Sequence, residues 1–382
     1  MNELKIYDLS IHINLKHALV AVIDRCLDAF AEEDDDLGHT NLVDHAINTG
    51  HSPPFKEKLR PLLLSRRAFV DNEIDRFLEH GIISPADPGN CPYASPIVVV
   101  NKKEVDLLLL ALALRMCIDF RRLNKDTVKD AYPLPRIDDI ITELRGSKFF
   151  ASLDLLMGYH QISIKMEDRP KTAFITHRGL FMFNRMPFGL CNAPATFQRL
   201  MDNLFQTEIG RILLVYLDDL LLFAKTEAEL LVSLEKILNK LIGAGLKCKP
   251  RKCQLFRDSI DYLGHVISEK GIAPDPKKIE KIKQWPFPIT GLEMLSLLRL
   301  CNYYRRLIPH FSEWAAPLYR ISRETKIAAN AELQLTFNRL KTAACAVPSL
   351  KIPDPNKAFM LETDASGIAE GAVLKQTGDQ GE

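Results

Sequence analysis

The sequence predicts an α+β fold, organised around the run Ile212–Ala224, in which two adjacent carboxylates interrupt an otherwise apolar segment. Strand-like apolar runs and amphipathic helices occur on both sides of this run, and no internal repeat or low-complexity linker separates them. A chain of 382 residues is too long for one ordinary core, so we expect two to four subdomains.

The adjacent carboxylates are Asp218 and Asp219. A membrane span needs about 20 apolar residues without central charges, and a buried helix would point neighbouring Asp side chains about 100° apart. A β-hairpin with strands Leu213–Tyr216 and Leu220–Phe223 places the Asp pair at its turn, where Asp is favoured. Two carboxylates that are partly buried side by side need a positive partner, and the run holds no Lys or Arg. A divalent metal ion is therefore the favoured partner.

The remaining elements follow from hydrophobic periodicity and from Gly or Pro at the boundaries. The expected strands are Ser95–Val100, Arg115–Arg121, Phe149–Leu155, Thr172–Thr176, Leu180–Asn184, Ile260–Ile267 and a hairpin over Phe359–Leu374. The expected helices lie within Phe55–Gly81, Pro133–Leu144, Ala193–Phe205, Glu227–Ala244, Pro276–Trp285 and Leu292–Leu307. The Leu/Ala-rich segment Glu104–Leu114 has no turn residues although strands flank it, and it could form a helical insert.

Composition excludes several classes of protein. The eight Cys form no CxxC pair or Cys/His cluster, which favours free thiols in a reducing compartment and gives no zinc site. The N-terminus lacks a signal pattern, and no apolar run is long enough for a bilayer. We therefore expect an intracellular, cytoplasmic protein that is not secreted and has no membrane partner.

The net charge of +1 hides an asymmetry along the chain. Residues 1–50 carry three basic and ten acidic side chains, whereas residues 245–326 carry sixteen basic and eight acidic side chains. A basic region in a near-neutral protein favours a local track for a polyanion such as a nucleic acid, and the alternative is an ordinary solvated charged face.

A third carboxylate, Asp154, ends the buried strand that begins at Phe149. Three carboxylates at strand ends can converge on two metal ions, the arrangement that serves in-line nucleotidyl transfer, and hard oxygen ligands suit Mg²⁺. The sequence has no GxxxxGK[ST] loop, HExxH motif or nucleophile elbow. P-loop ATPases, zincins and α/β hydrolases are therefore weak alternatives.

Ordered motifs along most of the chain carry a resemblance to a known family. They are Asp119-Phe120-Arg121-Arg122-Leu123-Asn124, Leu153-Asp154, Gly158-Tyr159-His160-Gln161, Met186-Pro187-Phe188-Gly189-Leu190, Tyr216-Leu217-Asp218-Asp219, Tyr262-Leu263-Gly264-His265 and Tyr303-Tyr304-Arg305-Arg306. From about Leu37 onward the chain resembles the reverse transcriptase region of the Pol polyprotein of gypsy-type long-terminal-repeat retrotransposons. The resemblance implies a right-hand polymerase with fingers, palm and thumb, followed by the start of a truncated ribonuclease H-like domain.

The resemblance also implies residue roles. Asp154, Asp218 and Asp219 are the expected catalytic and metal-binding residues, with two Mg²⁺ ions as cofactor and Mn²⁺ as the alternative ion. The expected nucleotide-binding residues are Lys102, Arg115, Tyr159, Phe188 and Gly189; for Tyr159 a core aromatic is the alternative. The expected primer–template residues are Leu263, Gly264, Lys277 and Lys281, the two lysines being chosen because they share one helix face.

The expected function is RNA-directed DNA synthesis from dNTPs on a primed RNA or DNA template, within a virus-like particle where the parent element is intact. The expected domains are a leader (1–55), fingers and palm (56–267), thumb and connection (268–345) and a ribonuclease H-like start (346–382). The oligomeric state stays open.

Two departures from the family pattern qualify these expectations. The family has a short Asp-Gly-type turn where this chain has Glu104–Leu114, so Lys102 and Arg115 need not meet at one nucleotide. The alternative function is therefore an impaired remnant that only binds nucleic acid. Near the C-terminus, Asp364 resembles the first metal ligand of ribonuclease H, but the other acidic ligands do not follow, so we expect no ribonuclease H activity.

Overall fold

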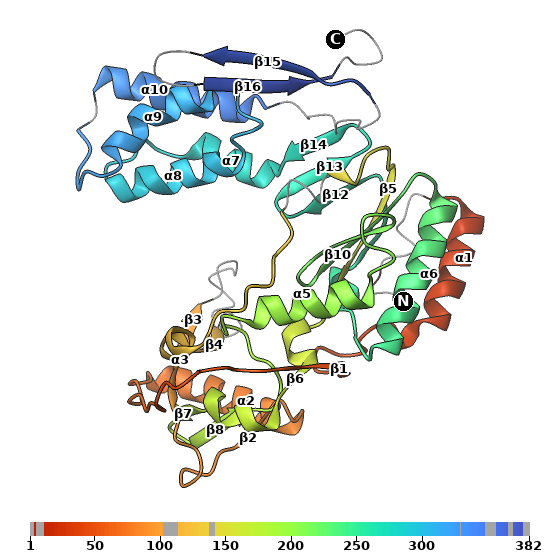
Figure 1. The fold of residues 1–382 in the computed structure, drawn as a ribbon, viewed down its shortest axis with the longest axis vertical. Helices are drawn as coiled ribbons and strands as arrows, with labels where there is room; N and C mark the ends of the chain where they lie inside the picture. Colours follow the sequence, from red (N-terminus) through yellow and green to blue (C-terminus); the bar gives the residue numbers. More distant parts are fainter. Residues whose placement is uncertain are drawn as a thin grey trace. The chain divides into compact units, whose positions relative to one another are not determined.

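The structure is a computed structural model that describes residues 4, 11–101, 114–136, 142–328, 330–347, 357–365 and 370–376. The chain divides into two compact units. The first comprises Met1–Pro135, Ala151–Leu222 and Glu227–Phe256, and the second comprises Arg136–Phe150, Phe223–Thr226 and Arg257–Glu382. Figure 1 labels most of the helices and strands of both units.

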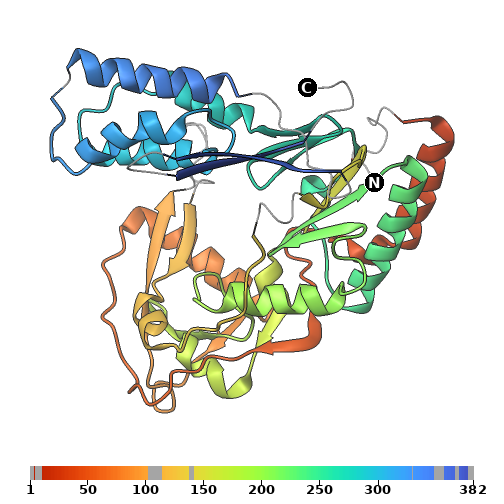
Figure 2. The same ribbon diagram turned by 45° about the horizontal axis from the view of Figure 1, so that its top comes forward.

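Three sheets account for the strands from β1 to β11. The four-stranded sheet has the order β11-β5-β10-β9, the five-stranded sheet has the order β2-β8-β7-β3-β4, and β1 pairs in parallel with β6. In Figure 2 the orange strands β3 and β4 lie side by side, as their antiparallel pairing requires. The bounds are β1 Thr40–His45, β2 Ile83–Pro85, β3 Ser95–Asn101, β4 Leu114–Ile118, β5 Phe149–Asp154, β6 Ile162–Ile164, β7 Phe174–Thr176, β8 Gly179–Phe183, β9 Leu213–Tyr216, β10 Asp219–Ala224 and β11 Gln254–Arg257.

Helices of the first unit cover these strands with apolar faces. In α6, buried residues recur at helical spacing from Leu230 to Leu241, and α1 runs beside it (Figure 1), joined by the ion pair of Arg25 with Glu235 at 2.7 Å. The helices are α1 Ile13–Arg25, α2 Leu64–Glu79, α3 Arg121–Asp126, α5 Ala193–Leu204 and α6 Glu227–Gly243, with short 3₁₀ turns η3 Leu27–Ala29, η5 Gly158–Gln161, η6 Met166–Thr172 and η7 Pro250–Lys252.

The second unit combines a small antiparallel sheet with a helical core. Fully buried Leu297, Leu298, Leu318 and Leu340 lie in one apolar cluster shared by the helices. The strands are β12 Ser259–Tyr262, β13 His265–Ser268, β14 Gly271–Pro274 and the hairpin β15 Met360–Ala365 with β16 Glu370–Lys375; the helices are α7 Pro276–Gln284, α8 Gly291–Tyr303, α9 Phe311–Ile321 and α10 Ala331–Cys345.

The structure confirms most of the predicted elements and corrects three. The hairpin around Asp218 and Asp219 is confirmed, as are strands β3 and β5 and helices α5, α6 and α7. The single strand predicted over Ile260–Ile267 is wrong, because Leu263 and Gly264 form a turn that divides it into β12 and β13. The strand predicted to reach Arg121 ends at Ile118, where α3 follows. The helix predicted over Leu292–Leu307 ends at Tyr303.

Other predictions fall on segments outside the described residues. Nearly all of Glu104–Leu114 and the middle of the helix expected within Pro133–Leu144, residues 137–141, belong to these segments. Within the described ranges, no helix is long and apolar enough to cross a membrane.

Candidate active site

The Asp pair sits at a two-residue turn whose first residue has an unusual backbone. Tyr216 pairs with Asp219 across the hairpin, so Leu217 and Asp218 form the turn, and Leu217 has φ 57°. A left-handed conformation costs a residue with a Cβ about 1–2 kcal/mol. The Leu217 N–H donates to Oε1 of Gln198 on α5 at 2.9 Å, and this contact holds the turn in place.

Gln198 is a positioning residue that the sequence did not reveal. Its side chain is buried, and its Nε2 donates to Oδ1 of Asp202 one turn further along α5 at 2.9 Å. Both ends of the amide are therefore engaged. The only sequence signal is a polar residue on the buried face of a helix with the apolar neighbours Phe197 and Met201.

Asp154 is the last residue of β5 and is held from two sides. Its carboxylate lies 3.1 and 3.2 Å from Nζ of Lys252, and its carbonyl oxygen accepts the Lys249 N–H at 2.8 Å. The carboxylate is about one-quarter exposed. Burial raises its pKa, Lys252 opposes this effect, and the negative charge of Asp218 adds to it.

Asp219 begins β10, and its pKa is raised further than that of Asp154. The apolar strands around it remove part of its hydration although the residue keeps contact with solvent. This desolvation, followed by repulsion from Asp218 and then from Asp154, raises its pKa to about 6. The structure thus brings the three predicted carboxylates close enough to repel one another.

The excess of negative charge at these three carboxylates favours binding of a divalent cation, and carboxylate oxygens are suitable ligands for one. Carboxylate oxygens are the ligands that Mg²⁺ and Mn²⁺ prefer, and a cation would relieve the repulsion that raises the pKa of Asp219. In the conformation described here, no three His, Cys, Asp or Glu side chains among the described residues converge closely enough to hold an ion. The convergence of Asp154 with the Asp pair on metal ions stays a prediction, and in this conformation Lys252 supplies the positive charge at Asp154.

Aromatic side chains border the Asp pair. The Tyr159 ring lies 5.0 Å from the Phe188 ring and 5.4 Å from the Phe197 ring, measured between centroids. Burial, and then the charge of Asp218, raises the pKa of the Tyr159 hydroxyl to about 12. Phe188 is half exposed, so the Tyr159–Phe188 pair offers an apolar surface beside the carboxylates.

The turn at Gly189 is fixed by the motif that begins at Asp119. Gly189 has φ 95°, and its carbonyl oxygen accepts the side-chain amide of Asn124 at 2.8 Å. The carbonyl oxygen of that amide accepts the Cys191 N–H at 2.8 Å. Asn124 therefore bridges the turn that presents Phe188.

Of the two residues predicted to hold the triphosphate, the structure describes Arg115 and does not describe Lys102. Arg115 is an exposed residue of β4, where it pairs with Val100 of β3. Lys102 lies outside the described residues, as does the segment that joins it to Arg115. Their meeting at one nucleotide stays a prediction.

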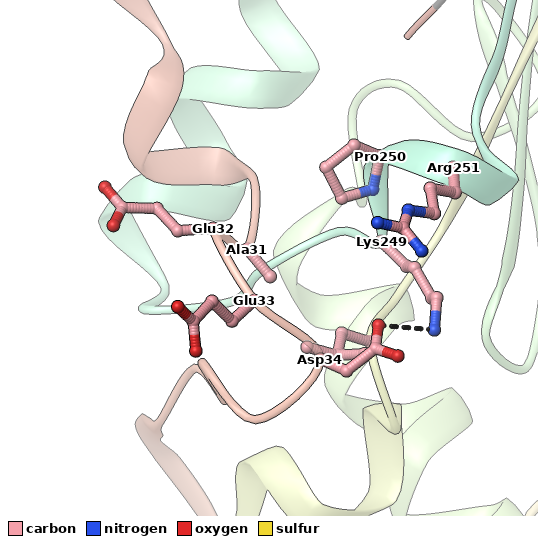
Figure 3. Close-up of a pocket in the computed structure, with 8 residues that line it drawn as sticks. Ala31, Glu32, Glu33, Asp34, Lys249, Pro250 and Arg251 are labelled. Carbon is pink, nitrogen blue, oxygen red and sulfur yellow. Dashed lines mark hydrogen bonds and ion pairs between the residues drawn. The ribbon is translucent and has the colours of Figure 1, made fainter. Parts of the chain in front are cut away.

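The acidic run of the leader neutralises part of the predicted basic region. Figure 3 shows Asp34 directed at Lys249, and their charged groups lie 2.7 Å apart. Asp36 pairs with Lys247 at 2.6 Å, and the Lys247 backbone is bridged to η5 by the buried side chain of Gln161. Lys247 and Lys249 thus already have acidic partners. The candidate surface for a polyanion is therefore the rest of the basic region, which continues to residue 326.

In the second unit, two of the predicted primer-contacting residues, Leu263 and Gly264, form the turn between β12 and β13. Leu263 has φ 47° and Gly264 has φ 75°, the left-handed pair that a two-residue hairpin turn requires. Lys277 and Lys281 are exposed on α7. Asp364 lies in β15 opposite Gly371.

Comparison with known proteins agrees with this geometry. Residues 100–267 match the reverse transcriptase (RNA-dependent DNA polymerase) family, and residues 330–382 match the RNase H-like domain found in reverse transcriptase. The retrovirus-related Pol polyprotein from transposon 297 of Drosophila melanogaster is 38% identical over 349 residues, which are 91% of this chain and 32% of that protein. The corresponding polyprotein from transposon gypsy is 35% identical over 391 residues, 99% of this chain and 37% of that protein.

Among solved structures, the foamy viral protease-reverse transcriptase in complex with RNA/DNA hybrid has a TM-score of 0.87 at 24% identity and covers 100% of this chain and 50% of that one. The fold is therefore the predicted α+β fold of right-hand polymerases, and residues 100–267 match the reverse transcriptase family. The predicted resemblance to Pol polyproteins of gypsy-type retrotransposons is confirmed. The chain spans about a third of the length of these relatives.

Proposed function

We propose that this chain is an RNA-directed DNA polymerase that extends a primer on an RNA or DNA template with dNTPs. One observation carries the proposal. The Tyr216–Asp219 hairpin places two carboxylates near that of Asp154, and all three lie inside the segment that matches the reverse transcriptase family. A solved relative is named as a complex with RNA/DNA hybrid and another as a complex with double-stranded DNA, which supports a primer–template as the partner.

The three carboxylates would hold two divalent metal ions, with Mg²⁺ as the first choice and Mn²⁺ as the alternative. When bound, such ions lower the pKa of the attacking primer hydroxyl and neutralise charge on the triphosphate. Asp154 must release Lys252 to serve this role, since its carboxylate is paired with that ammonium group. Gln198 keeps Asp218 and Asp219 in place by holding the Leu217 N–H.

The chain's other residues position the nucleotide. Tyr159, packed on Phe188 and Phe197, lies near Asp218, where it would exclude a ribose 2′-hydroxyl. The Gly189 turn fixes Phe188 through Asn124. Arg115 is exposed, and its guanidinium group suits phosphate binding through charge-assisted hydrogen bonds.

The alternative function is that of an impaired remnant that binds nucleic acid without using a nucleotide. The feature that favours it is the segment Glu104–Leu114, which replaces the short Asp-Gly-type turn of the resembling family. The domain limits at residues 55, 267 and 345 and a cytoplasmic, particle-associated location also remain proposals.

Primer extension by the purified chain tests the proposal. An RNA template with an annealed DNA primer, dNTPs and Mg²⁺ should give extended product, and Asp218→Asn should abolish it while leaving duplex binding unchanged. Asp261→Asn, which neutralises an exposed carboxylate on β12, is the matched control and should extend normally. Duplex binding without extension by the parent protein would favour the remnant, and extension by Asp218→Asn at the parent's rate would refute the carboxylate site.

A further inference from the structure

The turn between β12 and β13 is held by two consecutive tyrosines at the end of α8. The Tyr303 hydroxyl donates to the carbonyl oxygen of Leu263, and the Tyr304 hydroxyl donates to the carbonyl oxygen of Gly264 at 2.6 Å. Tyr304 is buried, whereas Tyr303 is partly exposed. Both hydroxyl protons are therefore committed to the turn, and neither is available to a ligand.

Lys278 places a positive charge beside this turn. Its Nζ lies 4.7 Å from the centroid of the Tyr303 ring and 5.9 Å from that of Tyr304. A Cβ added at Gly264 would collide with the same Nζ, so the ammonium group lies directly against the backbone of the turn. The absence of a side chain at Gly264 thus makes room for the charge.

The ammonium group keeps its charge available. Aromatic faces attract a cation without neutralising it, and in the described part of the chain no carboxylate forms an ion pair with Lys278. Lys283, five residues further along α7, instead lies 3.8 Å from Glu280. Lys278 therefore has its ammonium group beside the turn and no anionic partner among the described residues, and a phosphate could fill that role.

We propose that Lys278 binds a backbone phosphate of the primer strand where that strand passes the Leu263–Gly264 turn. The proposal rests on the polymerase function above and identifies one contact within it. It differs from the choice of Lys277 and Lys281 made from helical spacing, because spacing alone does not show which face of α7 meets the turn. The structure assigns that face to Lys278, with its ammonium group over the rings of the tyrosine pair.

The salt dependence of duplex binding tests this assignment. Each phosphate contact contributes about 0.9 to the slope of log affinity against log salt, so Lys278→Met should lower the slope by about 0.9. Between 50 and 200 mM salt the parent's affinity should then fall about 3.5-fold more than the variant's. Lys278→Arg should keep the slope, and Lys283→Met on the same helix is the matched control. The binding partner is a primer–template duplex without dNTPs, and thermal melting checks that each variant is folded.

A double-mutant cycle with Tyr303→Leu separates a phosphate contact from general loss of charge. Removing the ring should release the ammonium group, so Lys278→Met should cost less affinity in the Tyr303→Leu background than in the parent. Additive effects would overturn the proposal. So would an unchanged slope for Lys278→Met, with or without a lower slope for Lys277→Met and Lys281→Met. A raised KM for dNTP with an unchanged duplex slope would assign Lys278 to the nucleotide and also overturn the proposal.

Failure here is distinguishable from failure of the proposed function. The slope is measured by binding alone, so it can assign or exclude the Lys278 contact in a chain that does not extend primers. If the parent protein binds no duplex at all, both this proposal and the polymerase function are wrong. If it extends primers and Lys278→Met keeps the full slope, only the present proposal fails.

Discussion

Neutralising Asp219 should stabilise the metal-free protein at neutral pH. Its folded pKa of about 6 lies above the ordinary value of 3.8, so the folded state holds the proton more tightly than the unfolded state does. Stability from this group is fully present below about pH 4 and is lost as the pH rises through 6. Asp219→Asn should remove this loss of stability at neutral pH, because a neutral amide is not repelled by Asp218 and Asp154.

The size of the effect follows from the pKa and from the exposure of the side chain. A rise from 3.8 to about 6 would correspond to about 3 kcal/mol in a fully buried group. Asp219 keeps contact with solvent, and screening reduces the expected gain to about 1 kcal/mol at pH 7. The gain should shrink toward zero at pH 4.

Urea unfolding in EDTA at pH 4 and pH 7 measures this difference, with Asp261→Asn as an exposed control. Added Mg²⁺ should then stabilise the parent protein at pH 7, since a ligand that binds only the folded state raises its stability. Asp219→Asn should lose most of that response. Equal stability of parent and variant at both pH values would refute the electrostatic reasoning, and an unchanged Mg²⁺ response would refute the metal site.

Three further changes test the surroundings of the carboxylates. Gln198→Leu should cost about 1–3 kcal/mol by leaving the Leu217 N–H without its acceptor, and it should slow extension more than it weakens duplex binding; equal losses in both would contradict a positioning role. Lys252→Met should destabilise the metal-free protein at pH 7 by up to about 1 kcal/mol, because Asp154 loses its counter-ion, and Mg²⁺ should restore more stability to this variant than to the parent in a melting experiment. Replacing Glu104–Leu114 with an Asp-Gly-type turn should raise apparent dNTP affinity at least tenfold if Lys102 and Arg115 then share one triphosphate, and no change in KM would show that the segment is harmless.

The sequence predicted the parts of the site that depend on local pattern. An Asp pair between apolar runs predicts a hairpin whose turn carries the charges, and the structure has that hairpin. Asp154 was predicted because it ends a strand-like run. By contrast, Gln198 contacts Leu217, and Lys252 contacts Asp154 across 98 positions. Such partners depend on tertiary packing, which periodicity does not encode.

The same reason explains the errors in the second unit. Ile260–Ile267 is apolar enough to be one strand, and a single Gly does not predict two consecutive left-handed residues. The turn forms because tyrosines about 40 positions away donate to its carbonyl groups. Helical spacing likewise paired Lys277 with Lys281 but could not show that Lys278 lies over Tyr303.

The turns at Leu217–Asp218 and Leu263–Gly264, both proposed to lie at substrate, are stabilised in the same way. Leu217 and Leu263 are non-glycine residues held in left-handed conformations, with φ 57° and φ 47°. Such a conformation costs about 1–2 kcal/mol, and one hydrogen bond contributes about 0.5–1.5 kcal/mol. Gln198 supplies that bond at the first turn and Tyr303 at the second. Because cost and contribution are similar, removing these helix side chains should let each turn lose its shape. Backbone strain that is held by surrounding contacts is typical of functional sites. Gln198 and Tyr303 have no expected contact with the reacting atoms. They should nevertheless control the positions of the carboxylates and of the primer, because each holds one strained turn.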